Sequence, residues 1–378
     1  MRLWPGRRAA ATPSFVSDDL LIVEDRLRRN VEDLFTVRER QIRGGVVMFR
    51  GSFTSDPARA VDFLLARFRP LGYTPFVGRD GDQVVIQAWP MPDPVLRQRI
   101  GLNVVLFVLT CMSTLFAGLA FSGSPAFDAL RASPGIARFF AGVPFAFTIM
   151  LILGVHEFGH YFTARYYRAS VSLPYFIPAP PIVGTFGAII RMKSPARDRN
   201  SLFDIAVAGP VAGLLIALLA MAVGLEWSRV GPATPEQMVF GQSLLLRFLV
   251  YLRFGSIPDG GMVYTHPVAD AAWVGFLVTG LNLFPIGQLD GGRIAYALFG
   301  RHHRAVGVVT FLGLLLMGLL TGALNWFVWG ALILFLVGFR HSPPLDDVTP
   351  LTPARRLLGV ICLVLVVLLL PPVPFEID

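Results

Sequence analysis

Long hydrophobic segments follow one another from residue 100 to near the end of the 378-residue chain. A helix that crosses a lipid bilayer needs about 20 predominantly apolar residues. The pattern predicts seven candidate spans, at residues 102–121, 139–162, 203–225, 271–289, 305–320, 324–339 and 357–370. The last three are short, so one of them is expected to be tilted, re-entrant or merged with its neighbour. We therefore expect a polytopic α-helical membrane protein with six or seven transmembrane helices.

The first 95 residues have a different pattern, in which polar residues interrupt short apolar runs. A charge-rich stretch at 18–43 includes an amphipathic pattern that favours a helix near 20–35. Asp80-Gly81 lies between two apolar runs, which is a hairpin signal. The remaining elements predicted here are strands at 45–53, 72–77 and 83–88 and a helix at 57–68. This pattern is typical of a small, soluble α+β module.

The composition agrees with a membrane protein and argues against a nucleic-acid partner. Hydrophobic residues make up 54% of the chain and charged residues only 15%, whereas soluble domains carry about 25% charged residues. The net charge of +8 comes almost wholly from arginine, since Lys193 is the only lysine. Basic charge indicates nucleic-acid binding only when it covers a face of a polar domain. Cys111 and Cys362 both fall within candidate spans and are interpreted as packing residues.

The distribution of arginine predicts how the spans are oriented. Basic residues follow the second, fourth and sixth candidate spans, at Arg165, Arg168, Arg191, Lys193, Arg197, Arg199, Arg293, Arg301, Arg304, Arg340, Arg355 and Arg356. Because basic loops stay in the cytosol, the N-terminus is expected there too. Residues 226–270 would then lie on the far side, with the apolar stretch 244–254 at the interface.

These patterns together predict three regions and a location. The regions are a soluble cytosolic module at 1–95, a membrane core at 100–339, and a cytosolic loop with a C-terminal transmembrane helix at 340–378. The basic residues near the N-terminus are not followed by an apolar core, so no cleavable signal peptide is expected. The arginine- and alanine-rich composition favours a multi-pass protein of a bacterial inner membrane. Its oligomeric state is left open.

The sequence His156-Glu157-Phe158-Gly159-His160 lies inside the second candidate span. Residues four apart share one face of a helix, so the two imidazoles could hold one Zn²⁺. Glu157 could then act as general base towards a zinc-activated water. Ionisable groups inside a membrane segment are costly and usually functional. A zinc site is therefore favoured over a buried structural cluster.

A catalytic zinc site needs a third protein ligand and an open position for water. Asp290, at the end of the fourth candidate span, is one of few carboxylates that lie deep in an apolar segment. The second and fourth spans are predicted to run in the same direction, so Asp290 and His160 should reach a similar depth. Gly291 and Gly292 would let the helix break there, next to a cavity.

With these residues the chain resembles the site-2 protease family of intramembrane zinc metalloproteases. The resemblance covers roughly residues 100–339 and lies in three blocks, 156–160, 184–213 and 282–292. The amino-acid sequences of these blocks are similar to those of the bacterial and plastid branch of the family, which has a soluble N-terminal extension. The resemblance implies that His156, His160 and Asp290 bind zinc and that Glu157 is the catalytic base. It implies regulated intramembrane proteolysis, with a transmembrane protein as the substrate.

The resemblance also implies a membrane-associated β-hairpin in the proline-broken segment after the second span. Gly184, Thr185, Phe186 and Gly187 begin the predicted strand at 184–192, whose edge could pair with an unwound substrate. The alternative is a connecting loop. Asn282, two helical turns before Asp290, is a candidate for binding the substrate backbone or the oxyanion. A helix-packing amide is the equally weighted alternative.

Two other functions compete with proteolysis. A catalytically silent scaffold would keep the fold and bind clients. Such a protein should tolerate the loss of Glu157, so the presence of Glu157 argues against this alternative. A divalent-metal transporter could use the same histidines and aspartate as transit ligands. Transporters usually show several polar spans or a repeat symmetry, and this sequence has neither.

Overall fold

The computed structural model describes residues 18–91, 100–120, 125–180, 183–232 and 239–376. The basic segment before residue 18, on which the signal-peptide prediction rests, lies outside these residues. The chain forms two compact units. The first contains the described part of residues 1–96 together with Lys193–Leu202 and Ser342–Thr352. The second contains the helices of the apolar part, residues 97–192, 203–341 and 353–378.

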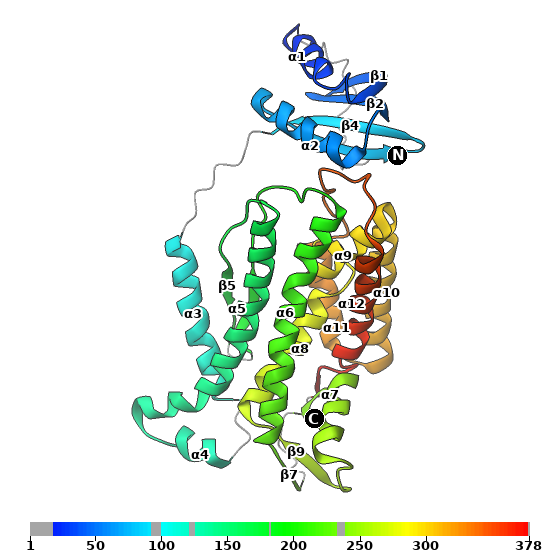
Figure 1. Cartoon of the computed structure of the whole chain (residues 1–378). Helices are drawn as coiled ribbons and strands as arrows, with labels where there is room; N and C mark the ends of the chain where they lie inside the picture. Colours follow the sequence, from blue (N-terminus) through cyan, green and yellow to red (C-terminus); the bar gives the residue numbers. More distant parts are fainter. Residues whose placement is uncertain (1–17, 92–99, 121–124, 181–182, 233–238, 377–378) are drawn as a thin grey trace. The chain divides into compact units, whose positions relative to one another are not determined.

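The first unit is built on an antiparallel four-stranded sheet in the order β1-β2-β4-β3 (Figure 1). Asp56 caps α2 by accepting a hydrogen bond from the Arg59 backbone N–H, and Pro57 begins the helix. Phe35, Phe49 and Phe68 are fully buried between sheet and helices. The elements are α1 (Asp18–Arg29), β1 (Phe35–Arg43), β2 (Val46–Phe53), α2 (Pro57–Phe68), a 3₁₀ turn (Arg69–Leu71), β3 (Tyr73–Asp80) and β4 (Gln83–Pro90).

One element of this unit differs from the sequence-based prediction. The helix expected near 20–35 ends at Arg29, and a strand, Phe35–Arg43, begins where the helix was expected to finish. That strand pairs with β2 through a turn at Gly44 and Gly45, both of which have positive φ. Pairing with a neighbouring strand therefore outweighs the weak helical pattern of this polar stretch.

Two segments from later in the chain extend the sheet beyond β3. The backbone of Val77 exchanges hydrogen bonds with Leu345 and Asp347, and Leu345 in turn donates to the Ala196 carbonyl. Arg197 forms an ion pair with Asp62 at 2.6 Å. The first unit is thus made of three chain segments, two of which connect helices of the second unit. The functional boundaries at 1–95, 100–339 and 340–378 stay predictions.

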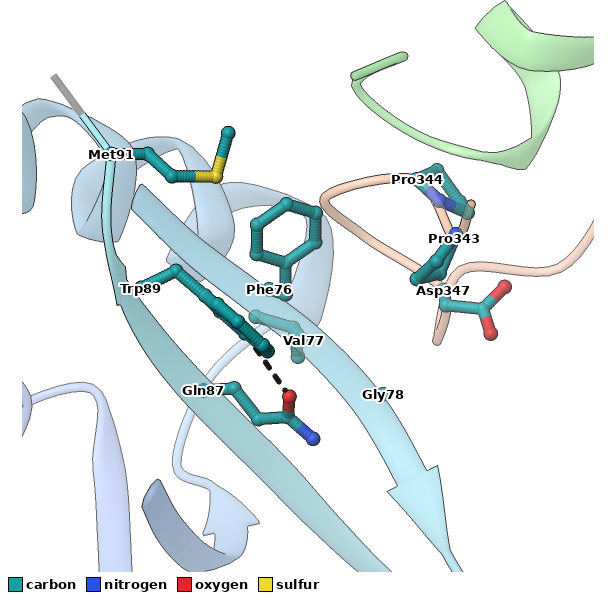
Figure 2. Close-up of a pocket in the computed structure, with 9 residues that line it drawn as sticks. All are labelled: Phe76, Val77, Gly78, Gln87, Trp89, Met91, Pro343, Pro344 and Asp347. Atoms are coloured by element: carbon teal, nitrogen blue, oxygen red, sulfur yellow. Dashed lines mark hydrogen bonds between the residues drawn. The ribbon is translucent and has the colours of Figure 1, made fainter. Parts of the chain in front are cut away.

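A small apolar recess lies where the residue 342–352 segment meets the sheet. Figure 2 shows Phe76 and Trp89 on β3 and β4, with Pro343 and Pro344 opposite them. The Trp89 indole N–H donates to the Gln87 side-chain oxygen at 3.2 Å. The recess holds about 60 Å³, whereas ligand pockets hold about 300–1,000 Å³. It is therefore a packing gap rather than a ligand site.

The second unit is a helical bundle (Figure 1). Four of its described helical stretches are long and apolar enough to cross a membrane: Ile100–Gly118, Gly135–Tyr166, Arg199–Glu226 and Asp290–Thr321. They comprise α3 (Ile100–Gly118), a 3₁₀ turn (Gly135–Gly142) with α5 (Val143–Tyr166), α6 (Arg199–Glu226), and α9 (Asp290–Phe299), a second turn (Gly300–His302) and α10 (His303–Thr321). A membrane protein with small β-sheets is thus confirmed, whereas a count of six or seven spans stays a prediction.

Shorter elements complete the second unit. Almost every residue of α8 is buried, because this helix packs against both α5 and α12. The shorter helices are α4 (Pro125–Arg131), α7 (Leu244–Phe254), α8 (Pro267–Asn282), α11 (Leu324–Leu332) with a π turn (Ile333–Val337), and α12 (Pro353–Leu369). Two small sheets pair β7 (Arg229–Pro232) with β9 (Gly261–Tyr264) and β8 (Val239–Phe240) with β10 (Phe375–Glu376).

The fourth candidate span ends earlier than predicted. Helix α8 stops at Asn282, residues 283–289 form an irregular connection, and Asp290 is the first residue of α9. Pro285 and Gly287, whose φ is +52°, lie in the connection. Asp290 therefore begins a helix rather than ending one, although the break in the helix was expected in this region.

The predicted strand at 184–192 forms part of an antiparallel hairpin. Strand β6 (Thr185–Ile189) pairs with β5 (Tyr175–Pro178), and a bridge between Val171 and Met192 extends the pairing. Strand β5 lies against α3. Gly184 has a φ of +82°, and its carbonyl accepts a hydrogen bond from the Ser113 hydroxyl of α3. The hairpin is thus fastened to the bundle by α3, and within the two-stranded sheet β6 has one unpaired edge.

Candidate metal centre

Two histidines and a glutamate of α5 are buried inside the second unit. His156, Glu157 and His160 each expose less than 5% of their surface. The Nε2 atoms of His156 and His160 are 3.1 Å apart, because residues four apart on a helix lie one above the other. The motif therefore presents two imidazole nitrogens to a single point.

Asp290 completes this cluster from the start of α9. Its Oδ2 lies 3.1 Å from His160 Nε2 and 3.4 Å from His156 Nε2. Ligands bonded to Zn²⁺ at about 2.0–2.1 Å in a tetrahedron are about 3.3 Å apart. The three atoms already have this spacing, and among the described residues they form the one His/Cys/Asp/Glu cluster compact enough to hold a metal ion. The donor set of two imidazoles and one carboxylate suits zinc.

A hydrogen bond on the far side of His160 sets its tautomer. Its Nδ1 lies 2.6 Å from the backbone carbonyl oxygen of Ile205 on α6. A carbonyl only accepts, so Nδ1 carries the proton and donates it. A neutral His160 then turns the lone pair of Nε2 towards a carboxylate and a second imidazole, an arrangement that a divalent cation stabilises.

Glycines of α6 make room for both imidazole rings. A Cβ at Gly209 would lie 2.1 Å from His160 Nε2, and a Cβ at Gly213 would lie 3.0 Å from the His156 Cβ. The two glycines are four residues apart, as the two histidines are, so α6 presents one gap to each ring. The two glycines therefore accommodate the imidazole rings of His160 and His156.

The position of Asp290 depends on a tight backbone arrangement before α9. A Cβ on Gly291 would lie 1.9 Å from the Leu283 carbonyl oxygen, and one on Gly292 would lie 2.4 Å from the Gly287 carbonyl oxygen. Only glycine permits this fold of the chain. With its side chain 13% exposed against 4% for each histidine, Asp290 is the most accessible of the three candidate ligands.

Glu157 has a buried oxygen with no partner among the described residues. Its Oε2 makes no hydrogen bond, and a buried polar atom left in that state is costly. The backbone of Ile190, directly after β6, lies against the carboxylate, and the charge of Arg293 on α9 is near it. The side chain is thus held beside the metal cluster and next to the hairpin. The sequence analysis used Arg293 only to orient the spans, so its nearness to Glu157 was missed.

An ionic network ties together the ends of α5, α6 and α12. Arg355 donates to both carboxylate oxygens of Asp204, at 2.6 and 2.7 Å, and the Tyr167 hydroxyl donates to the same carboxylate. Burial and the hydrogen bond to Asp204 raise the pKa of Tyr167 to about 12. Asp204 directly precedes Ile205, whose carbonyl orients His160. No spacing in the sequence pointed to this network, because its members are far apart in the chain.

The candidate substrate-binding residues lie in two places. Asn282 ends α8, at the start of the connection that leads to Asp290. In the hairpin, Thr185 is buried and its hydroxyl donates to the carbonyls of Ile177 and Gly187. Phe186, by contrast, exposes 73% of its surface, and Gly187 has a φ of +96° with open space around it. Thr185 therefore shapes the hairpin, and Phe186 faces outward.

The part of the chain that contains this cluster matches a known family. Residues 144–320 match the model of peptidase family M50, and this range includes both histidines, Glu157 and Asp290. The chain belongs to the site-2 protease family. This agrees with the resemblance found in the sequence.

Curated relatives of this site-2 protease homologue include plant proteins. It is 33% identical to the probable zinc metalloprotease EGY1, chloroplastic, of Arabidopsis thaliana, over 75% of this chain and 55% of the relative. It is 32% identical to the probable zinc metalloprotease EGY2, chloroplastic, of the same plant, over 66% of this chain and 45% of the relative. The chain spans about half the length of these relatives. No solved structure matches the chain.

Proposed function

We propose that this protein is a zinc-dependent endopeptidase that cleaves a peptide bond in or near the transmembrane helix of a membrane-protein substrate. The observation that carries the proposal is the triangle of His156, His160 and Asp290 with the Glu157 carboxylate beside it, whose Oε2 has no partner among the described residues. The family match and the names of the plant relatives support the same activity.

In this proposal the two imidazoles and the Asp290 carboxylate hold Zn²⁺. A zinc ion in such a site acts as a Lewis acid, making water more acidic and polarising a carbonyl group. The Glu157 carboxylate accepts a proton from the attacking water and then donates that proton to the departing amide nitrogen. The hydrogen bond from His160 Nδ1 to Ile205 keeps the imidazole in the tautomer that the metal needs.

We further propose that the free edge of β6 binds the substrate as an added strand. The bond to be cleaved must leave its helix, and pairing with a strand edge would hold it extended. Ile190, which follows β6, lies against Glu157, so a segment paired there would pass close to the base. Asn282 is proposed to hydrogen-bond the substrate backbone or the oxyanion.

The predicted orientation is retained as a proposal. The arginine-rich connections and the N-terminus would face the cytosol or the equivalent compartment, with the lipid bilayer around the second unit. A bacterial inner membrane was predicted from composition, whereas the plant relatives are named as chloroplastic. Fractionation of the native host with antibody against the N-terminal unit would decide between these locations.

The metal site is tested by zinc quantification on the purified full chain. Wild type should carry about one zinc per chain, and His160→Ala and Asp290→Ala should each lose most of it. His303→Ala, which removes a buried histidine outside the cluster, is the matched control and should retain zinc. Full metal retention in both ligand variants would rule out the proposed site.

The catalytic role is tested with a transmembrane reporter substrate in proteoliposomes. Glu157→Gln keeps the shape of the side chain but removes the base, so cleavage should fall by about 10²–10⁴-fold while zinc stays bound. Glu226→Gln, at an exposed ion pair with Arg253, serves as the control. Undiminished cleavage by Glu157→Gln would refute the mechanism even if the zinc site is real.

The hairpin proposal is tested by disulfide crosslinking. With Cys111 and Cys362 replaced by serine, Phe186→Cys should crosslink to a cysteine placed near the cleavage site of the reporter. Leu219→Cys on α6, which also exposes most of its side chain, should not. Equal crosslinking from both positions would mean that the substrate is not held at β6.

A further inference from the structure

A large cavity lies in the second unit between α7, α10 and α12. It holds about 540 Å³, well within the roughly 300–1,000 Å³ of small-molecule sites. Its lining is largely apolar, from Leu314 and Met317 on α10 to Val366 and Leu370 on α12. One side reaches Phe284 in the connection that leads to Asp290. The cavity is separate from the metal cluster, none of whose residues lines it.

The helices that form the cavity present apolar side chains to the outside as well. Leu312 and Leu316 on α10 and Val360 and Val364 on α12 are all more than half exposed, and none of them lines the cavity. In a membrane, such surfaces face hydrocarbon. Gly313, which lines the cavity, would place a Cβ in open space. A lipid chain could therefore enter from the surrounding bilayer without displacing protein atoms.

The polar groups of the lining gather at the start of α7. Gln242 and Arg247 line the cavity, and no carboxylate among the described residues does so. The other polar groups are satisfied internally, since Thr310 donates to the Val306 carbonyl and the Trp326 indole N–H donates to the Pro372 carbonyl. No ion pair or side-chain hydrogen bond is formed by Arg247 within the described chain, whereas Arg253 on the same helix pairs with Glu226.

We propose that this cavity binds an anionic phospholipid, with one acyl chain in the apolar interior and the phosphate against Arg247. The site is apolar along its length and cationic at one end, which is the complement of such a lipid. An apolar peptide segment would leave the arginine without a counter-charge. Arginine, in addition, binds phosphate through two parallel N–H donors. This lipid site does not depend on the proposed protease activity.

Native mass spectrometry of the full chain, released from detergent with added lipid, tests the proposal. Phosphatidylglycerol should form a one-to-one complex at least about ten times more stable than that of phosphatidylcholine, because the choline cation of phosphatidylcholine offsets the phosphate charge that Arg247 would pair with. Gly313→Phe fills the cavity and should abolish the complex. Arg247→Gln should remove the preference for phosphatidylglycerol and leave weak binding of both lipids.

Two control variants and a folding readout keep the result interpretable. Leu312→Phe alters the neighbouring residue of α10, which does not line the cavity, and Arg253→Gln removes the other arginine of α7. Both should bind phosphatidylglycerol as wild type does. Far-ultraviolet circular dichroism and thermal unfolding, measured on every variant, report whether the bundle has folded. Equal lipid retention by Gly313→Phe and wild type, or equal binding of the two lipids by wild type, would overturn the proposal.

Discussion

Glycines in two helices of the same bundle have opposite surroundings. On α6, Gly209 and Gly213 touch the rings of His160 and His156 so closely that an added Cβ would collide with one and press on the other. On α10, Gly313 faces open space at the large cavity. The same residue type therefore marks a closely packed contact in one helix and an unfilled space in the other.

The difference shows that this protein packs its helices closely at the candidate metal site and loosely at the cavity. A metal site needs its donor atoms held within a fraction of an ångström, so its supporting helices approach each other as closely as glycine allows. The cavity beside α10 has no such requirement, because lipid or another mobile apolar group can fill it. Substitutions that add a single methyl group should therefore have a large effect at the metal site and a small effect at the cavity.

The largest effect is expected from Gly209→Ala. The new methyl group would lie 2.1 Å from His160 Nε2, so the imidazole must leave the cluster, and zinc affinity should fall by at least about 100-fold. Zinc quantification checks this result. Gly154→Ala, on α5 with nothing within 4 Å of the added Cβ, is the control. Normal zinc affinity in Gly209→Ala would show that α6 does not confine His160.

A smaller loss is expected from Gly213→Ala. Its Cβ would lie 3.0–3.1 Å from atoms of His156, a contact that a shift of a few tenths of an ångström relieves. Zinc affinity should fall about tenfold, measured by competition with a chelator. An effect as large as that of Gly209→Ala would mean that the rings cannot move at all.

The network at the ends of α5, α6 and α12 predicts a late tyrosine titration. The pKa of Tyr167 is raised to about 12, from an ordinary value of about 10. Burial and the hydrogen bond to Asp204 both disfavour the ionised Tyr167, so its contribution to stability is fully present below pH 10 and is lost as the pH rises through 12. Absorbance titration should show one late-ionising tyrosine that disappears in Tyr167→Phe. An unchanged titration curve in that variant would contradict the assignment.

The smallest effect is expected from Gly313→Ala. The added methyl group enters open space, and alanine favours a helix by up to about 1 kcal/mol over glycine. Thermal unfolding should show equal or slightly higher stability, with unchanged zinc content. A marked loss of stability would mean that the cavity is closed in the folded protein.

Much of the fold could be predicted from hydropathy, because a bilayer admits few alternatives to apolar helices. Three of the four long helical stretches lie where the apolar runs predict them, and the fourth contains the predicted span 305–320 but begins at Asp290. The predicted helix boundaries are wrong where the local pattern of apolar and polar residues is weak. Residues 30–34 were predicted to end a helix but form a turn before β1, and Asp290 was assigned to the end of a helix that stops at Asn282. In both places contacts with distant parts of the chain decide the conformation.

The sequence by itself determined the chemistry of the candidate site. The spacing of His156, Glu157 and His160 on a helix follows from local geometry alone, and Asp290 is one of few carboxylates deep in an apolar segment. Only the tertiary structure decided how the site is supported, through the Ile205 carbonyl, the glycines of α6 and the network around Asp204. It alone placed Arg247 in the lining of an apolar cavity. The physical reason is that helix periodicity is a local property, whereas the space between helices depends on residues far apart in the chain.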